Sequence, residues 1–282
     1  MTKHVSFSEI TKTNLRIKLV DIGANPILGK PPYAPLMDVG EADVIGFEPN
    51  PEALAKLNEM KGPNETYLPH AIGDGTRRAL HICQDGGMTS LLEPDPKVLD
   101  LFHGFPDWGA VIATEEIDTV RLDDIPQARG VDYIKIDIQG GELMALASGP
   151  DCLASTLLIQ CEVEFMPMYR DQPLFSEVEQ FLRGHGFMFH RFFPAVSRVI
   201  RPMKVKNDIR AGLSQLVWAD AIFIRDITKL DRLSDIQLLK LAKILHECYQ
   251  SIDVILYLLL EYDRRCSTAI ADAYKRFLMT LG

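Results

Sequence analysis

The sequence predicts an α/β fold, a parallel sheet with helices on both faces, and three observations lead to this prediction. Short apolar runs rich in Val, Ile and Phe alternate with helix-like segments between about residues 15 and 193. The runs are apolar nearly throughout, which is typical of strands buried on both faces. Strand–helix alternation also indicates right-handed crossovers between parallel strands.

Seven apolar runs predict the strands of this sheet. The first six, in chain order, are "IKLVDIG", "DVIGFEP", "ETYLPHAIG", "DYIKIDI", "TLLIQCEVEF" and "FMFHRFF". The seventh, "LVWADAIFIRD" at 216–226, follows a basic irregular stretch, and we expect it to enter the sheet as an antiparallel strand. Among the helices, Asn50 and Pro51 predict an N-cap followed by a first helical residue. Ser176 with Glu179 predicts a capping box.

A helical segment follows the sheet. From Ser234 onward apolar residues recur at helical spacing, and Ser234 with Gln237 predicts another capping box. We therefore expect a domain at 1–228 and a helical cap or docking segment at 229–282. The run "VILYLLL" at 254–260 is apolar over nearly two turns. The run can be buried by packing on the domain or by a twofold homodimer. The homodimer is favoured because the run is apolar over more surface than one packed face requires.

Composition limits the classes of partner. The 282 residues are 47% hydrophobic and 24% charged, which is ordinary for a globular protein. A net charge of −9 argues against a nucleic-acid partner, since phosphate contacts come mainly from Lys and Arg. A local basic patch around 198–206 remains compatible with this balance.

The sequence also predicts a cytoplasmic protein without a membrane partner. The N-terminus lacks a basic region followed by an apolar core, and the apolar run 254–260 is far shorter than the roughly 20 residues that span a bilayer. Five cysteines with no C-x-x-C spacing indicate buried thiols in a reducing compartment.

The loop after the first strand indicates the class of cofactor. A dinucleotide site needs G-x-G-x-x-G, whereas here Gly23 is followed by Asn25 and a proline-rich stretch at 26–36. S-adenosylmethionine carries an ammonium and a carboxylate in place of phosphates, so Asp21 suits the ammonium. Asn25 suits the carboxylate or holds the turn, since Asn tolerates left-handed backbone angles. Glu48, at the end of the second strand, suits the two ribose hydroxyls. We expect the proline-rich loop to act as a lid, with Tyr33 covering the ligand.

Seven short motifs in register support this cofactor. They are "VDIGAN", "GFEPNPEAL", "AIGDG", "MTSLLEP", "TVRLDDI", "DYIKIDIQGGELMAL" and "CEVEFMPMY". In order and spacing the chain resembles the FkbM-type methyltransferases over roughly residues 15–226. The resemblance implies a Rossmann-like class I fold and S-adenosylmethionine-dependent methylation of hydroxyl oxygens. The loop after Asn25 departs from the family pattern, so contacts of residues 26–36 do not carry over.

The candidate site residues fall into three groups. Asp137, at the end of the fourth strand, and Glu162, within the fifth strand, are the predicted catalytic acids, because an alcohol needs a general base. The same acids are also suited to a divalent cation, and the choice between these roles stays open. The remaining predicted residues, some implied by the resemblance alone, are Asp21, Gly23, Asn25, Glu48, Asn50, Asp74 and Ser90 for the cofactor and Glu164, Tyr169 and His190 for the acceptor.

The predicted function is therefore an O-methyltransferase acting on a hydroxyl of a sugar, glycan or secondary metabolite. An alternative is an inactive protein of the same fold that docks a partner through residues 234–281. The intact acids favour the enzyme, and the missing G-x-G-x-x-G argues against a nicotinamide dehydrogenase. The acceptor would be contacted by loops, so its identity does not follow from these motifs.

Overall fold

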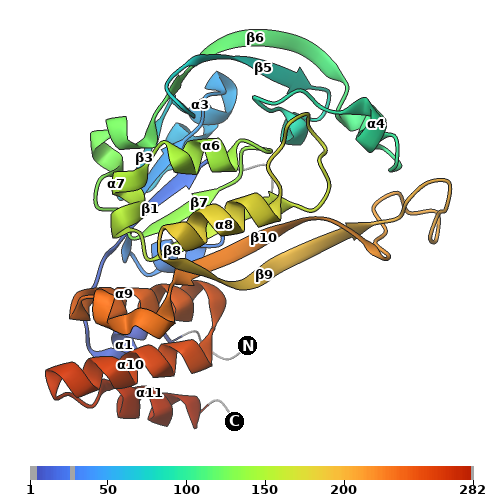
Figure 1. Ribbon diagram of the computed structural model, residues 1–282. Coiled ribbons are helices and arrows are strands. Elements are labelled where there is room, and N and C mark those ends of the chain that lie inside the picture. Colours follow the sequence, from blue (N-terminus) through green and yellow to red (C-terminus); the bar gives the residue numbers. More distant parts are fainter. Residues whose placement is uncertain (1–4, 26–28, 281–282) are drawn as a thin grey trace.

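A seven-stranded sheet forms the centre of the protein, and the computed structural model describes residues 5–25 and 29–280 (Figure 1). The strand order is β3-β2-β1-β7-β8-β10-β9. Neighbouring strands from β3 to β8 pair in parallel, and β10 is antiparallel to both β8 and β9. The predicted parallel sheet with an antiparallel closing strand is confirmed. The strands are β1 Ile17–Ile22, β2 Ala42–Phe47, β3 Glu65–Leu68, β7 Tyr133–Ile136, β8 Leu158–Glu164, β9 Phe187–Arg198 and β10 Gln215–Arg225.

A second, three-stranded sheet was not expected from the sequence. It contains β4 (Ala71–Ile72), β5 (Arg77–Cys83) and β6 (Val111–Val120), and β5 and β6 form an antiparallel ribbon that arches over one side of the molecule (Figure 1). The first six residues of β6 are all exposed. A ribbon with little burial leaves no apolar periodicity in the sequence, which explains why it was missed.

Helices on one face of the sheet share a core with its strands. They are α6 (Glu142–Ala147), α7 (Pro150–Ser155) and α8 (Phe175–Gly184). A further helix, α3 (Pro51–Met60), connects β2 to β3. Asn50 caps α3 as predicted, its side chain accepting the N–H groups of two first-turn residues at 3.0 Å. The capping box predicted from Ser176 and Glu179 is wrong. The helix begins at Phe175, and Glu177 Oε2 accepts the Leu174 N–H at 3.1 Å, whereas Glu179 pairs with Arg183.

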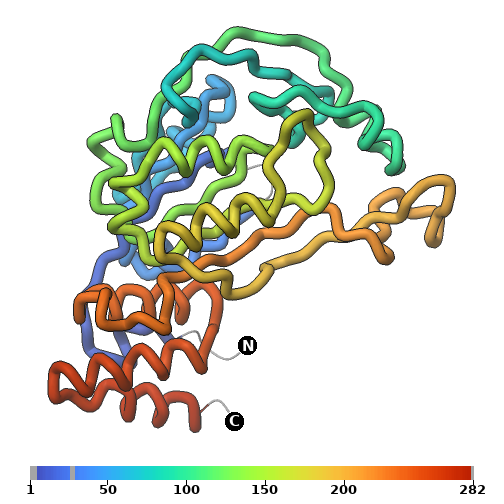
Figure 2. Tube along the Cα trace, in the orientation of Figure 1, coloured from blue at the N-terminus to red at the C-terminus, as the bar shows by residue number. Residues whose placement is uncertain are grey.

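The opposite face is covered by the C-terminal helices, with which the N-terminal α1 packs (Figures 1 and 2). Ser234 and Gln237 cap α9 as expected. Leu241 and Leu258 belong to the same buried cluster as Leu19 of β1, so residues after 228 share their core with the sheet. The helices on this side are α1 Phe7–Thr11, α2 Ala34–Asp38, α9 Asp235–Ile244, α10 Ile252–Cys266 and α11 Ile270–Leu278.

Most of the apolar run in α10 is used inside the chain. Val254, Ile255, Leu258 and Leu259 are buried, whereas Tyr257 and Leu260 are half exposed at 50% and 47%. Packing on the domain therefore accounts for most of this surface. The homodimer stays a prediction, and the two exposed side chains are what it would cover.

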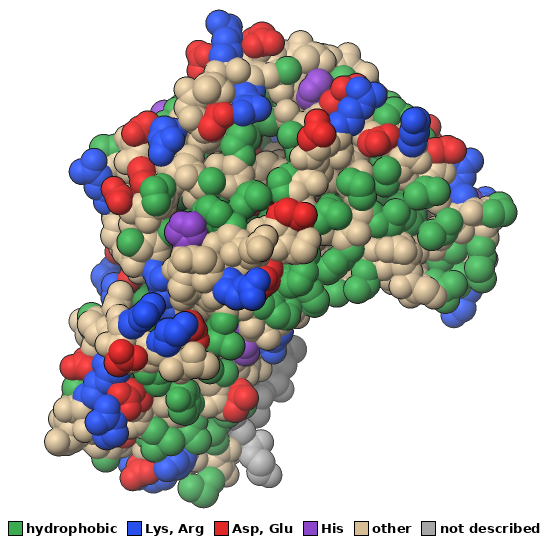
Figure 3. Space-filling view, in the orientation of Figure 1, with side chains coloured by type: hydrophobic (Ala, Val, Ile, Leu, Met, Phe, Trp, Pro, Cys, Tyr) green, Lys and Arg blue, Asp and Glu red, His purple; other side chains and the backbone are tan. Residues whose placement is uncertain are grey.

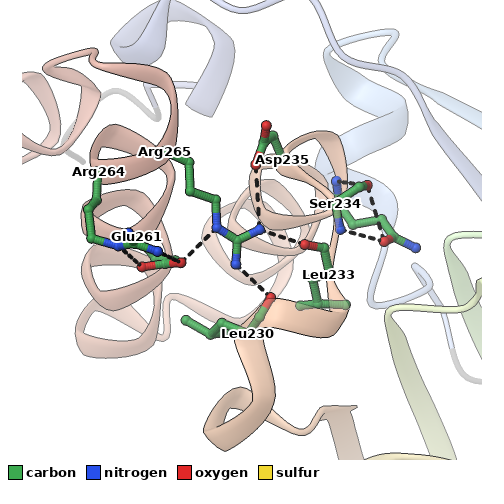
Figure 4. A network of polar contacts seen from close by, with 8 residues as sticks. Leu230, Leu233, Ser234, Asp235, Glu261, Arg264 and Arg265 are labelled. Carbon is green, nitrogen blue, oxygen red and sulfur yellow. Dashed lines mark hydrogen bonds and ion pairs between the residues drawn. The ribbon is translucent and has the colours of Figure 1, made fainter.

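One arginine fixes α10 to the turn that precedes α9 (Figure 4). Arg265 donates to the carbonyl oxygens of Leu230 and Leu233 and to Glu261 Oε1, each at 2.7 Å. Its side chain is 19% exposed, so these bonds satisfy a mostly buried guanidinium.

The long hairpin of β9 and β10 extends beyond the sheet and carries exposed apolar side chains along its surface (Figures 1 and 3). Residues 200–204 and 206–210, which include most of the basic stretch noted in the sequence, are exposed. The five cysteines are free thiols. Among residues 5–25 and 29–280, no helix combines the length and apolar character needed to cross a bilayer.

Candidate functional site

Acidic side chains gather where the parallel strands end. Asp21 is near the end of β1, Glu48 directly follows β2, and Asp137 directly follows β7. Glu162 and Glu164 lie at the end of β8. Because carboxyl ends of parallel strands share one edge of a sheet, the edge where ligands bind in such folds is strongly acidic here.

A buried ion pair organises the β1 end. Asp21 is 3% exposed, accepts the Tyr33 hydroxyl at 2.6 Å, and lies 3.4 Å from Lys135 Nζ. Lys135 Nζ also donates to the Gly23 carbonyl oxygen at 3.1 Å and lies 3.8 Å from Asp137 Oδ2. Burial raises the pKa of Asp21, an effect that the Lys135 ammonium opposes. Burial also disfavours the ammonium, but the surrounding carboxylates outweigh it and raise the pKa of Lys135.

Tyr33 therefore has a different place from the one expected. Its ring is 2% exposed and packs edge-on against Tyr133, in the core shared with the C-terminal helices. In this structure it supports Asp21 from the interior instead of covering a ligand from outside. Residues 26–28 of the predicted lid lie outside the described residues, and Asn25, just before them, is partly buried.

Gly23 brings the ends of β1 and β7 into direct contact. Its φ is +81°, and a Cβ built there would lie 2.1 Å from the Asp137 carbonyl oxygen. A side chain at this position would therefore clash with backbone, so both the angle and the contact require glycine.

Glu48 presents one carboxylate oxygen that the protein leaves unused. The side chain is 5% exposed, and Oε1 accepts the Asn50 N–H at 2.8 Å. Within the described part of the chain, Oε2 makes no hydrogen bond. Burial raises the pKa of Glu48, the cost of placing a carboxylate here without a further partner.

Gln139, which the sequence reasoning missed, joins the two predicted catalytic acids. Its Nε2 donates to Asp137 Oδ1 at 2.9 Å and to Glu162 Oε2 at 2.6 Å. Its Oε1 accepts the Tyr169 hydroxyl at 3.3 Å, and its backbone adopts a left-handed φ of +61°. This residue lies in the turn between β7 and α6, and the partners of its side chain hold it in the left-handed conformation.

Three carboxylates surround this bridge. Glu142, the first residue of α6, is 2% exposed and accepts the Ile138 N–H at 2.8 Å, and burial raises its pKa to about 7. Burial and the neighbouring Asp137 raise the pKa of Glu162 well above its usual range. One oxygen from each of Asp137, Glu142 and Glu162 lies within 4.8 Å of the others, so these three residues could together hold a metal ion.

Ser90 and Tyr169 reach the same centre. Ser90 is 1% exposed, donates to the Gln139 carbonyl oxygen at 2.6 Å and accepts the Leu92 N–H at 2.9 Å. The buried Tyr169 hydroxyl also contacts the Met88 carbonyl oxygen at 3.1 Å. Both residues therefore hold the Gln139 turn in place.

Two predicted residues have other partners. Asp74 lies in the turn before β5, where it accepts hydrogen bonds from Thr76 and forms an ion pair with Arg78. His190 Nε2 lies 2.8 Å from Ser251 Oγ, in the C-terminal helical segment. The structure thus brings Asp21, Glu48, Asp137 and Glu162 to one edge, but it ties His190 to a different part of the fold.

Comparison with known proteins identifies the family of the chain. The family model described as the methyltransferase FkbM domain matches residues 21–189. The chain is 28% identical over 190 residues to the 2-O-methyltransferase NoeI of Sinorhizobium fredii (strain NBRC 101917 / NGR234), covering 59% of this chain and 75% of that protein.

Solved structures with a similar arrangement include two further proteins. Precorrin-6y C5,15-methyltransferase from Geobacter metallireducens GS-15 has a TM-score of 0.38 and 13% identity, over 78% of this chain and 86% of that one. LepI, solved in complex with SAM, has a TM-score of 0.33 and 12% identity, over 75% of this chain and 43% of that one. With a Rossmann-like α/β sheet and a family match over more than half its length, the chain belongs to the FkbM methyltransferase family.

Proposed function

We propose that this methyltransferase moves the methyl group of S-adenosylmethionine to a hydroxyl oxygen of a small-molecule or glycan acceptor. The observation that carries the proposal is the Asp137–Gln139–Glu162 bridge, which lies at the sheet edge that also holds Asp21 and Glu48.

The residues at the β1 and β2 ends fit the cofactor. Asp21 Oδ1, which makes no hydrogen bond within the described residues, suits a ligand ammonium. Glu48 suits both ribose hydroxyls, because Oε2 is unused and Oε1 accepts a single N–H. Gly23 brings backbone close to this edge in a turn without the glycines that a diphosphate requires. When bound, S-adenosylmethionine supplies a methyl carbon on a sulfonium, which is already a good leaving group.

The protein's task is then to orient the acceptor and take its proton. An alcohol is a weak acid, so a positioned carboxylate that accepts the hydroxyl proton lowers the barrier. Gln139 donates to both Asp137 and Glu162, and this holds both carboxylates in a fixed geometry as acceptors. Alignment of the acceptor oxygen with the methyl carbon supplies the rest of the rate enhancement.

Two observations support a hydroxyl acceptor. A site lined by several carboxylates suits a polar, hydroxyl-bearing molecule, because carboxylate oxygens accept hydrogen bonds from hydroxyl groups. In addition, the similar protein NoeI is named as a 2-O-methyltransferase. Two predicted acceptor contacts lie at this centre: the Tyr169 hydroxyl donates to Gln139 Oε1 at 3.3 Å, and Glu164 shares a face of β8 with Glu162.

The cofactor half of the proposal is tested by Glu48→Ala. Two charge-assisted hydrogen bonds worth about 1.5–3 kcal/mol each would be lost, so affinity for S-adenosylhomocysteine should fall by about 100-fold or more in calorimetry. Glu52→Ala, at an exposed acid in the first turn of α3, is the matched control and should bind normally. Equal affinity in Glu48→Ala and the unchanged protein would remove this assignment.

A further inference from the structure

Several carboxylates lie around Asp137, and in the described part of the chain the cation that contacts this group is Lys135. Asp220 of β10 lies directly opposite Glu162 of β8 in the antiparallel register, and it adds to the repulsion at Glu162. Among the described residues, the ion pairs of Lys135 are with Asp21 and Asp137. The acids at this centre are Asp137, Glu142, Glu162, Glu164 and Asp220, contributed by the β7 end, α6, β8 and β10.

The spacing of three of these acids matches the coordination of a hard divalent cation. Their ligand oxygens all lie within 4.8 Å of one another. Calcium binds oxygen at about 2.3–2.6 Å, so oxygens on opposite sides of the ion are about 5 Å apart. Magnesium binds at about 2.0–2.1 Å, so oxygens on opposite sides of it are about 4 Å apart, and a pair at the 4.8 Å limit would have to close by about 0.6–0.8 Å.

Glu164 gives a second and separate indication of a missing partner. Its side chain is 1% exposed, and its Oε1 is buried without a hydrogen bond. The nearby Gln172 amide favours the ionised form, but Gln172 Nε2 is itself without a hydrogen-bond partner. Glu162 and Glu164 are two residues apart on β8 and so share a face, and Glu142 is the strongest charged neighbour of Glu164. A buried carboxylate oxygen that faces this group and makes no hydrogen bond is costly unless a cation compensates it.

We propose that Asp137, Glu142 and Glu162 together bind one divalent cation, with Glu164 on its inner side. All the ligands are carboxylate oxygens, which select magnesium or calcium over softer metals. Asp137 is 20% exposed, so the ion has a route from solvent. The Gln139 amide bonds Asp137 Oδ1 and Glu162 Oε2. The ion would then take Glu162 Oε1 and Asp137 Oδ2, which lies 3.8 Å from Lys135 Nζ.

Such an ion would hold the acceptor hydroxyl beside the carboxylates. This role rests on the proposed methyl transfer, whereas binding of the ion does not. The two are therefore tested separately, by titrating metal without cofactor and by titrating cofactor without metal.

The experiment is calorimetric titration of the full chain, freed of metal by chelation, with magnesium chloride and in a second series with calcium chloride. We expect one ion per chain for at least one of the two metals. Removing a residue that only hydrogen-bonds to a metal ligand costs about 10–100-fold in metal affinity. Glu142→Gln and Glu162→Gln each remove a ligand itself, so each should weaken binding by at least about tenfold. Glu116→Gln, at an exposed acid of β6, is the control and should bind like the unchanged protein.

Each outcome bears on the inference. Both glutamine variants keep the size of the side chain, and a thermal melt of each shows whether it is folded. Weaker binding in folded Glu142→Gln and Glu162→Gln supports the site. No heat with either metal, or equal affinity in all variants, overturns it and leaves the group as carboxyls that share protons. If the ion binds but S-adenosylhomocysteine does not bind the chelated protein, the proposed function fails while the metal site stands.

Discussion

Replacing Lys135 with Met tests the electrostatic organisation of the site. Lys135 and Asp21 lie 3.4 Å apart with side chains only 15% and 4% exposed. At an effective dielectric constant of about 20, charges at this 3.4 Å separation attract by about 5 kcal/mol. Removing one partner of a buried pair costs about 3–5 kcal/mol, because the other charge stays buried alone. We expect Lys135→Met to lower the free energy of unfolding by about that amount near neutral pH.

The pH dependence of this loss has a definite sign. Burial already raises the pKa of Asp21, and loss of the ammonium raises it further. An acid whose pKa is higher in the folded state holds more protons there than in the unfolded state. Its contribution to stability therefore falls as pH rises above the ordinary aspartate value of about 3.9. Since the raised pKa of Lys135 keeps it charged throughout this range, the cost of Lys135→Met should shrink as pH is lowered from about 8 to about 5.

Urea denaturation of both proteins across this pH range measures the effect. The double variant Asp21→Asn/Lys135→Met removes both charges and should be more stable than Lys135→Met alone at neutral pH. If Lys135→Met lowers the free energy of unfolding by less than about 1 kcal/mol, or by an amount that does not change with pH, the ion pair does not have this role.

Three further predictions follow from the same geometry. Gly23→Ala should lower the melting temperature strongly. A left-handed angle costs about 1–3 kcal/mol in a non-glycine residue, and the new Cβ would lie 2.1 Å from the Asp137 carbonyl oxygen. An unchanged melting temperature contradicts this. Gln139→Ala should lower kcat by up to about 100-fold, within the range of general-base catalysis, and leave affinity for S-adenosylhomocysteine unchanged; a normal rate would show that the bridge to Glu162 is dispensable. The full chain should sediment as a dimer if the exposed residues of the 254–260 run pair across a twofold axis, and a monomer at micromolar concentration rules this out.

The sequence was most informative where a feature is local. Apolar runs located the strands of the large sheet, and the Asn50 and Ser234 caps are set by residues within one turn. The α8 start was misplaced because two glutamates, Glu177 and Glu179, compete as capping partners, and only the backbone geometry selects the first.

Features that depend on distant segments were not predictable in the same way. Gln139 gains its role only because β7 and β8 are neighbours, which places its amide between Asp137 and Glu162. Periodicity showed that the C-terminal helices have apolar faces but not that these faces join the core of the sheet. Tyr33 was expected to cover a ligand from the proline-rich loop, yet its hydroxyl reaches the buried Asp21.

The most direct test of the proposed activity is incubation of the protein with S-adenosylmethionine carrying a ¹³C-labelled methyl group and a panel of hydroxylated saccharides and metabolites. We expect a new methyl ether signal in the carbon spectrum of one acceptor class, and loss of that signal in Asp137→Asn and Glu162→Gln variants that still bind S-adenosylhomocysteine. Label on a carbon or nitrogen of the acceptor, or an undiminished ether signal in both variants, would contradict it.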